Sequence, residues 1–121
     1  MKLRLASDTI RIRVRKSDIG LLQKEGRLLE SIALPAGPPF EFAVQLDPHK
    51  KEMDVSWEGQ RLTVWLPAGP AGQWIDSEQV GMEASLPLAG NAALDVVVEK
   101  DFPCQHQPTT DPSDTFHELA P

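Results

Sequence analysis

Arginines recur at every second position in one short stretch near the start of the chain. Residues 10–15 read IRIRVR, so Arg11, Arg13 and Arg15 alternate with apolar residues. In a β-strand, a period of two places all three guanidinium groups on one face. Guanidinium groups donate paired hydrogen bonds to phosphate and carboxylate groups. The pattern therefore predicts a basic strand face that is able to bind an anion.

The preceding stretch adds to this basic face. Lys2 and Arg4 alternate with Leu3 and Leu5, and a short turn at residues 6–8 predicts a hairpin with the arginine strand. Like charges on opposed strands destabilise a sheet, so the cations need anions nearby. One source is a ligand, and the predicted anion-binding residues are Arg4, Arg11, Arg13 and Arg15. The alternative source is the chain itself, through Glu41, Asp54, Glu83 and Asp95.

Soft metal ligands gather near the other end of the chain. Cys104, His106 and His117 supply one thiolate and two imidazoles, and Asp111 or Asp114 is a candidate fourth donor. Zinc or copper takes such ligands, although the spacing matches no common zinc motif. A metal site at these residues is one hypothesis and a lone exposed thiol is the other. No cofactor is predicted.

The elements that position these residues follow from apolar periodicity. Apolar and turn positions repeat at an offset of 52 residues, which predicts two copies of a strand-strand-helix-strand-strand unit over residues 1–47 and 53–99. Ser17 is the predicted cap of the first helix and Gly26 its predicted end. Residues 1–102 are predicted to form a single domain. Residues 103–121, acidic and rich in proline, are predicted to form an irregular tail.

The predicted fold class is all-β with two short helices. The duplicated ββαββ units are expected to form an approximately eight-stranded antiparallel barrel or a barrel-like sandwich, because closure or stacking buries the apolar faces. The expected core includes Leu5, Ile12, Val14, Val44, Trp57, Val64 and Val96. A tunnel lined by the polar face is the alternative. Trp65 falls in phase with the polar face, where an exposed indole indicates a contact surface.

Charge and composition narrow the classes of function. The formal charge of −6 argues against a general nucleic-acid binder, yet residues 1–52 carry +3 and residues 53–121 carry −9. The halves therefore attract each other, or the basic half binds a partner. One cysteine, a start without the apolar run of a signal peptide and no long apolar stretch favour a cytoplasmic protein. The expected partner is an unidentified protein or a small anionic ligand. Binding to nucleic acid or to a membrane is not expected. A homodimer is compatible with the sequence.

The ends of the chain resemble an uncharacterised family of small bacterial proteins. The opening MKLRL, the strand TIRIRV and the Ser-Asp helix start cover residues 1–19, and the phrase VEKDFPC covers residues 98–104. Asp114, Thr115 and Phe116 continue the likeness into the acidic tail. The family is a domain of unknown function, so the resemblance implies no activity.

The doubled order of elements is also similar to the tunnel barrels of the adenylate cyclase and thiamine triphosphatase superfamily. That likeness implies a phosphate-handling tunnel, but the superfamily's strand of alternating glutamates is replaced here by the arginine strand. No acid pair, phosphate loop or catalytic triad stands at an informative spacing. The sequence thus favours a small non-catalytic binding module. An anion-binding tunnel barrel and a metal-binding protein are the alternatives.

Overall fold

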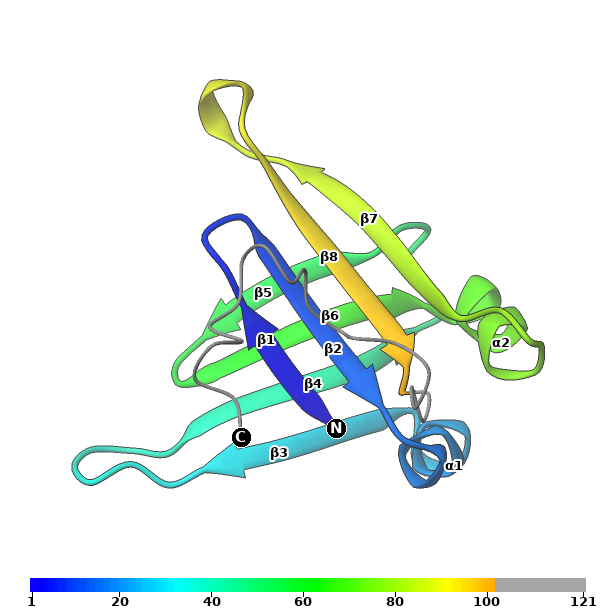
Figure 1. Ribbon diagram of the computed structural model, residues 1–121, viewed down its shortest axis with the longest axis horizontal. Coiled ribbons are helices and arrows are strands. Elements are labelled where there is room, and N and C mark those ends of the chain that lie inside the picture. Colours follow the sequence, from blue (N-terminus) through cyan, green and yellow to red (C-terminus); the bar gives the residue numbers. More distant parts are fainter. Residues whose placement is uncertain (102–121) are drawn as a thin grey trace, which may run out of the picture.

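The fold is taken from a computed structural model, which describes residues 1–101. Within them the chain runs through two successive sets of strand, strand, helix, strand and strand (Figure 1). The first set comprises β1 (Lys2–Leu5), β2 (Thr9–Val14), α1 (Lys16–Glu25), β3 (Arg27–Ile32) and β4 (Phe40–Asp47). The second comprises β5 (Asp54–Glu58), β6 (Arg61–Pro67), α2 (Ala68–Ile75), β7 (Gly81–Pro87) and β8 (Ala93–Lys100), with a short 3₁₀ turn η1 (Ala89–Asn91) before β8.

The strands form two mixed sheets of four. Sheet A has the order β1-β2-β8-β7 and sheet B the order β3-β4-β6-β5, so each sheet takes one hairpin from each half of the chain. The hairpins are antiparallel, whereas the central pairs β2–β8 and β4–β6 are parallel. The sheets stack with crossing strands (Figure 1). The predicted barrel-like sandwich is confirmed, but the closed, wholly antiparallel barrel is wrong because the two sheets share no paired strands.

The offset between equivalent positions changes along the chain. In the first hairpin of each half, the pair Leu3–Ile12 is equivalent to the pair Val55–Val64. Equivalent residues in these hairpins are therefore 52 positions apart, as predicted. Beyond the helices, however, the β3–β4 pair Arg27 with Gln45 corresponds to the β7–β8 pair Gly81 with Glu99, an offset of 54. The extra residues lie between α2 and β7. Because two residues are one full period of a strand, the apolar phase survives the change and hides it in the sequence.

The core lies between the two sheets. Its largest fully buried side chains are Ile12, Val14, Leu22, Val44, Val64, Leu66, Trp74, Val96 and Val98. Five of the predicted core residues are among them, so the predicted filled core is confirmed. The tunnel is wrong, because the apolar faces pack against each other and the polar faces of the strands turn outward.

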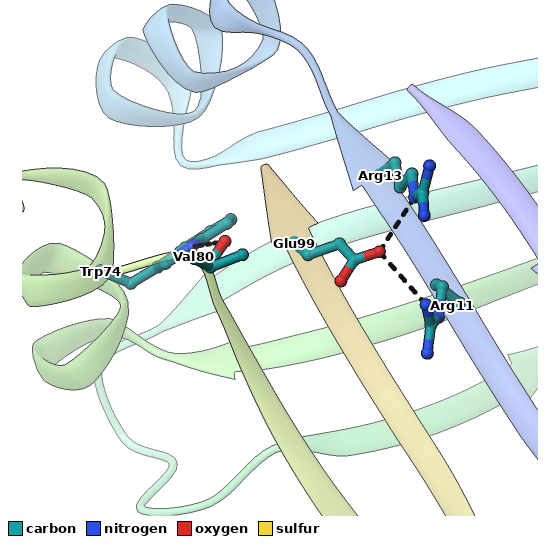
Figure 2. Close-up of polar contacts among 5 residues, drawn as sticks. All are labelled: Arg11, Arg13, Trp74, Val80 and Glu99. Atoms are coloured by element: carbon teal, nitrogen blue, oxygen red, sulfur yellow. Dashed lines mark hydrogen bonds and ion pairs between the residues drawn. The ribbon is translucent and has the colours of Figure 1, made fainter. Parts of the chain in front are cut away.

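The two helices cover one end of the sandwich. The α1 helix starts after Arg15, whose backbone N–H donates to the Asp18 carboxylate at 2.8 Å, so Ser17 lies inside the helix and is not its cap. Gly26 ends α1 in the left-handed conformation at φ 73°, as predicted. In α2, the buried indole of Trp74 donates from Nε1 to the carbonyl oxygen of Val80 at 3.0 Å (Figure 2).

The opposite end of the sandwich has no helix over it in the described residues. Leu5 is 56% exposed at the end of β1, and Trp57 is 58% exposed on β5, where it stacks on Phe40 at 5.9 Å. The prediction that Leu5 and Trp57 are core residues is therefore wrong. Both side chains share the phase of the apolar face but lie at the ends of edge strands. Within residues 1–101, no helix has the length and apolar character needed to cross a membrane.

Candidate anion-binding groove

Four cations come together on the outer face of sheet A. In the β1–β2 hairpin, Arg4 lies opposite Arg11 and Lys2 lies opposite Arg13. These are the like-charge pairs that the sequence predicts, and they require neighbouring anions. Arg15 does not join them, because the strand ends at Val14 and Arg15 occupies the N-cap position of α1. The structure thus brings together three of the four predicted anion-binding arginines.

One carboxylate lies between two of these arginines. Glu99 on β8 accepts a hydrogen bond at Oε1 from Arg13 Nε at 2.9 Å, and Arg11 Nη1 lies 3.5 Å from the same oxygen (Figure 2). The Glu99 side chain is 19% exposed and that of Arg13 28%. The parallel pairing of β2 with β8 places Glu99 directly beside Arg13. The two guanidinium groups therefore already hold one oxyanion.

The acidic residues that the sequence suggested as partners make no ion pair with Arg11 or Arg13 in the described residues. Glu41 is 3.2 Å from Arg61 and Asp54 is 3.1 Å from Lys50, both on sheet B. Glu83 and Asp95 border a second hollow of about 520 Å³ on sheet A, which Arg11 also lines, but neither carboxylate makes an ion pair in the described residues. The Lys50 ammonium, together with the hydrogen bond from the Val55 N–H, lowers the pKa of Asp54. Intramolecular neutralisation thus occurs, but through Glu99, which the sequence analysis missed.

A groove of about 870 Å³ runs beside this basic face. One wall is formed by residues 1–4, at the start of β1, and the other by residues 30–32, at the end of β3. The remaining described residues that line it are Arg11, Arg13, Phe42 and Asp101. We call this the basic groove. Its lining combines four cationic side chains with the apolar side chains of Leu3, Ile32 and Phe42.

Two carboxylates at the basic groove, Asp18 and Glu30, share one cationic partner, whereas Asp101, which lines the groove, makes no ion pair in the described residues. The α-ammonium group of Met1 lies 3.1 Å from the Asp18 carboxylate and 3.2 Å from the Glu30 carboxylate. These contacts tie the start of β1 to α1 and β3. Among the described residues, Lys2 and Arg4 make no ion pair, although both are exposed at the groove. Positive charge is therefore in excess along β1.

The outer face of sheet B is organised differently. Trp65 is half-buried there, with Nε1 donating to Ser56 Oγ at 2.9 Å and Lys50 Nζ lying 5.7 Å from the ring centroid. The expectation of an exposed indole is thus wrong, because neighbouring side chains cover the ring. Cys104, His106 and His117 lie outside the described residues. Within residues 1–101, no group of three or more His, Cys, Asp or Glu side chains is arranged to hold a metal ion.

Comparison with known proteins gives one match. The model of the family described as "Family of unknown function (DUF7009)" matches residues 1–119. No curated protein and no solved structure matches the chain significantly. The match covers nearly the whole chain and agrees with the resemblance to an uncharacterised family. Its description assigns no activity, so function has to be inferred from the basic groove.

Proposed function

The chain belongs to this family of unknown function, and we propose that it is a small non-catalytic binding module whose basic groove takes an acidic segment of a partner protein. The observation that carries the proposal is the charge excess along β1. Lys2 and Arg4 border the groove without an ion pair in the described residues, while Glu99 serves both Arg11 and Arg13. An acidic partner would relieve the repulsion between the opposed cations.

The remaining lining favours a polypeptide over a small ion. Ile32 is 49% exposed, and Leu3 and Phe42 add apolar surface to the same groove. A lone phosphate uses only the cations, whereas a peptide with both acidic and apolar side chains uses the whole lining. We place the module in a bacterial cytoplasm, where its single cysteine needs no disulfide partner.

A second candidate is an oxyanion site at Arg11 and Arg13. Both guanidinium groups reach the same Glu99 oxygen, so they are oriented to donate to one anion. Phosphate or sulfate would have to displace Glu99 or bind on its outer side. Arg4, opposite Arg11, and Lys2, opposite Arg13, are further donors on the same face. A small anion would then bind weakly, and salt would reduce its affinity.

Fluorescence anisotropy with a labelled acidic peptide tests the proposed function. The probe is a decapeptide of alternating glutamate and valine, and the test variant is Lys2→Ala/Arg4→Ala. Two charges near the site contribute about 0.5–1 kcal/mol each at low salt, so affinity should fall by about ten-fold. The matched control is Arg15→Ala/Lys16→Ala, which removes two exposed charges outside the described groove lining.

Equal binding by the two double mutants would show that the groove is not the site. If sulfate or polyphosphate binds with the same dependence on Arg11 and Arg13 while the peptide does not bind, the oxyanion candidate replaces the peptide. Circular dichroism spectra of both double mutants should match the wild-type spectrum, which checks that they remain folded. Neither variant removes a core side chain, since all four substituted residues are exposed.

A further inference from the structure

The β1 strand presents one backbone edge to the basic groove. Within residues 1–101, β1 pairs with β2 alone. At the turn of this hairpin the Ala6 N–H donates to the Thr9 carbonyl oxygen at 2.9 Å, which makes them a hydrogen-bonded pair. Hydrogen-bonded and non-hydrogen-bonded pairs alternate along an antiparallel ladder. Leu3 and Leu5 therefore belong to non-hydrogen-bonded pairs, and their N–H and C=O groups point away from β2.

The lining of the groove agrees with this direction. Four consecutive residues, 1–4, border the groove, although successive side chains of a strand point to opposite faces. A groove that contacts both faces of a strand in succession runs along the strand's edge. The facing wall is also an edge, since β3 pairs with β4 alone in the described chain. The basic groove is thus a seam between two sheet edges.

Charge distinguishes β1 from the other edge strands of the described sheets. The β1 sequence KLRL carries only positive charges. In contrast, β5 (DVSWE) and β7 (GMEASLP) carry only negative charges, and β3 (RLLESI) carries one of each. Basic side chains on an edge repel basic strands and attract acidic ones. An acidic strand therefore has one favoured edge among the four.

We propose that the acidic partner segment binds as an additional β-strand along the edge of β1; this rests on the proposed function and specifies how that groove is used. The backbone of the segment would hydrogen-bond with Leu3 and Leu5. Side chains beside Lys2 and Arg4 would lie on the outer, basic face. Those beside Leu3 would turn toward Ile32 and Phe42. The recognised pattern is therefore alternating acidic and apolar residues.

The start of β1 is fixed before any partner arrives. The Met1 ammonium group is held between Asp18 and Glu30, and Met1 itself is only 8% exposed. The Lys2 and Arg4 pairs with β2 hold the rest of the short strand. A partner strand would thus meet an ordered template, which lowers the entropy cost of binding.

Backbone methylation of the peptide tests strand addition with the full-length chain. Two versions of the alternating glutamate–valine decapeptide carry N-methyl groups on the valines only or on the glutamates only. In a bound strand, alternate N–H groups face β1. One version should therefore lose at least ten-fold in affinity while the other binds within about two-fold of the parent. Loss with methylated valines indicates antiparallel addition, and loss with methylated glutamates indicates parallel addition.

Amide exchange measured by NMR locates the edge. The N–H groups of Leu3 and Leu5 should exchange at least ten-fold more slowly with the parent peptide bound. Protection at Leu29 and Ser31 instead would assign the strand to β3, whose bond from Leu46 N–H to the Gly26 carbonyl sets the same alternation. A decapeptide of five glutamates followed by five valines has the same composition and charge. It should bind more weakly than the alternating peptide.

The outcomes separate the two proposals. If the parent peptide does not bind, the proposed function fails. If it binds but the two methylated versions behave alike, strand addition is overturned while groove binding stands. Protection of Leu3 and Leu5 in the peptide-free chain would show that another part of the chain or a second copy already occupies the edge. That result would also overturn the proposal of a partner strand.

Discussion

Replacing Glu99 with glutamine should weaken the fold and strengthen binding of an acidic peptide. The carboxylate contacts Arg13 at 2.9 Å and Arg11 at 3.5 Å, and glutamine keeps its size while removing its charge. At an effective dielectric constant of about 20, opposite charges about 4 Å apart attract by about 4 kcal/mol. Desolvation and screening offset most of this for partly exposed groups, so we expect a loss of about 1–2 kcal/mol.

The stability arm is measured by urea denaturation at low and high salt. In thermal unfolding, the expected loss of stability corresponds to a decrease in Tm of roughly 4–15 °C for a domain of this size. High salt should reduce the stability difference between the variant and the wild type. Glu83→Gln is the matched control, because Glu83 is an exposed carboxylate on the same sheet with no ion pair in the described residues. Its effect should stay below about 0.5 kcal/mol.

The binding arm uses the alternating glutamate–valine peptide. With Glu99 neutral, Arg11 and Arg13 become available to the peptide, so affinity should rise by about five-fold, or about 1 kcal/mol. A Glu99→Gln protein as stable as the Glu83→Gln control would refute the role of Glu99 as the counter-ion. Unchanged peptide affinity would show that Arg11 and Arg13 do not contribute to binding.

Three further predictions concern the scaffold. Val64→Ala removes a fully buried side chain from the core and should cost about 1–3 kcal/mol in urea unfolding; a change within experimental error would contradict the core assignment. Gly81→Ala places a Cβ 2.7 Å from the Val98 carbonyl oxygen, so it should destabilise by about 1–3 kcal/mol, and a neutral result would show that β7 and β8 separate easily. The pKa of Asp54 is lower in the folded chain than its ordinary value of 3.8, because the ionised carboxylate interacts with Lys50. This interaction therefore stabilises the fold fully above the unfolded pKa, and the stabilisation is lost as the pH falls through the folded pKa. The small stability difference from Asp54→Asn should thus be present at neutral pH and vanish in acid; a difference independent of pH would exclude the Lys50 interaction as its cause.

The alternation of apolar and polar residues predicted correctly which face of a strand each side chain occupies. This works because successive side chains of a strand point to opposite faces, which is a local property of the backbone. Ile12, Val14 and Val64 are buried as predicted, and Arg11 and Arg13 lie on the outer face. Local period does not report where a strand ends or whether its last residue is covered. Arg15 leaves the basic face to start a helix, and Leu5 and Trp57 stay exposed at strand ends.

The partner of the arginines could not be read from local patterns. Glu99 is 86 residues from Arg13 and meets it only because the second strand of one half pairs in parallel with the last strand of the other. Alternation specifies which face a side chain occupies, but it does not specify the neighbouring strand. The β1–β3 seam was missed for the same reason, since its walls belong to different sheets.

A ¹⁵N-resolved NMR titration of the full-length chain with the alternating glutamate–valine peptide tests most directly whether the basic groove is a binding site. Chemical-shift changes should concentrate in residues 1–5, at Arg11 and Arg13, and in residues 30–32. They should weaken as salt is raised. Chemical-shift changes concentrated on sheet B around Trp65 would contradict the proposal that the basic groove is the binding site. The absence of any shift change at a large excess of peptide would contradict it as well.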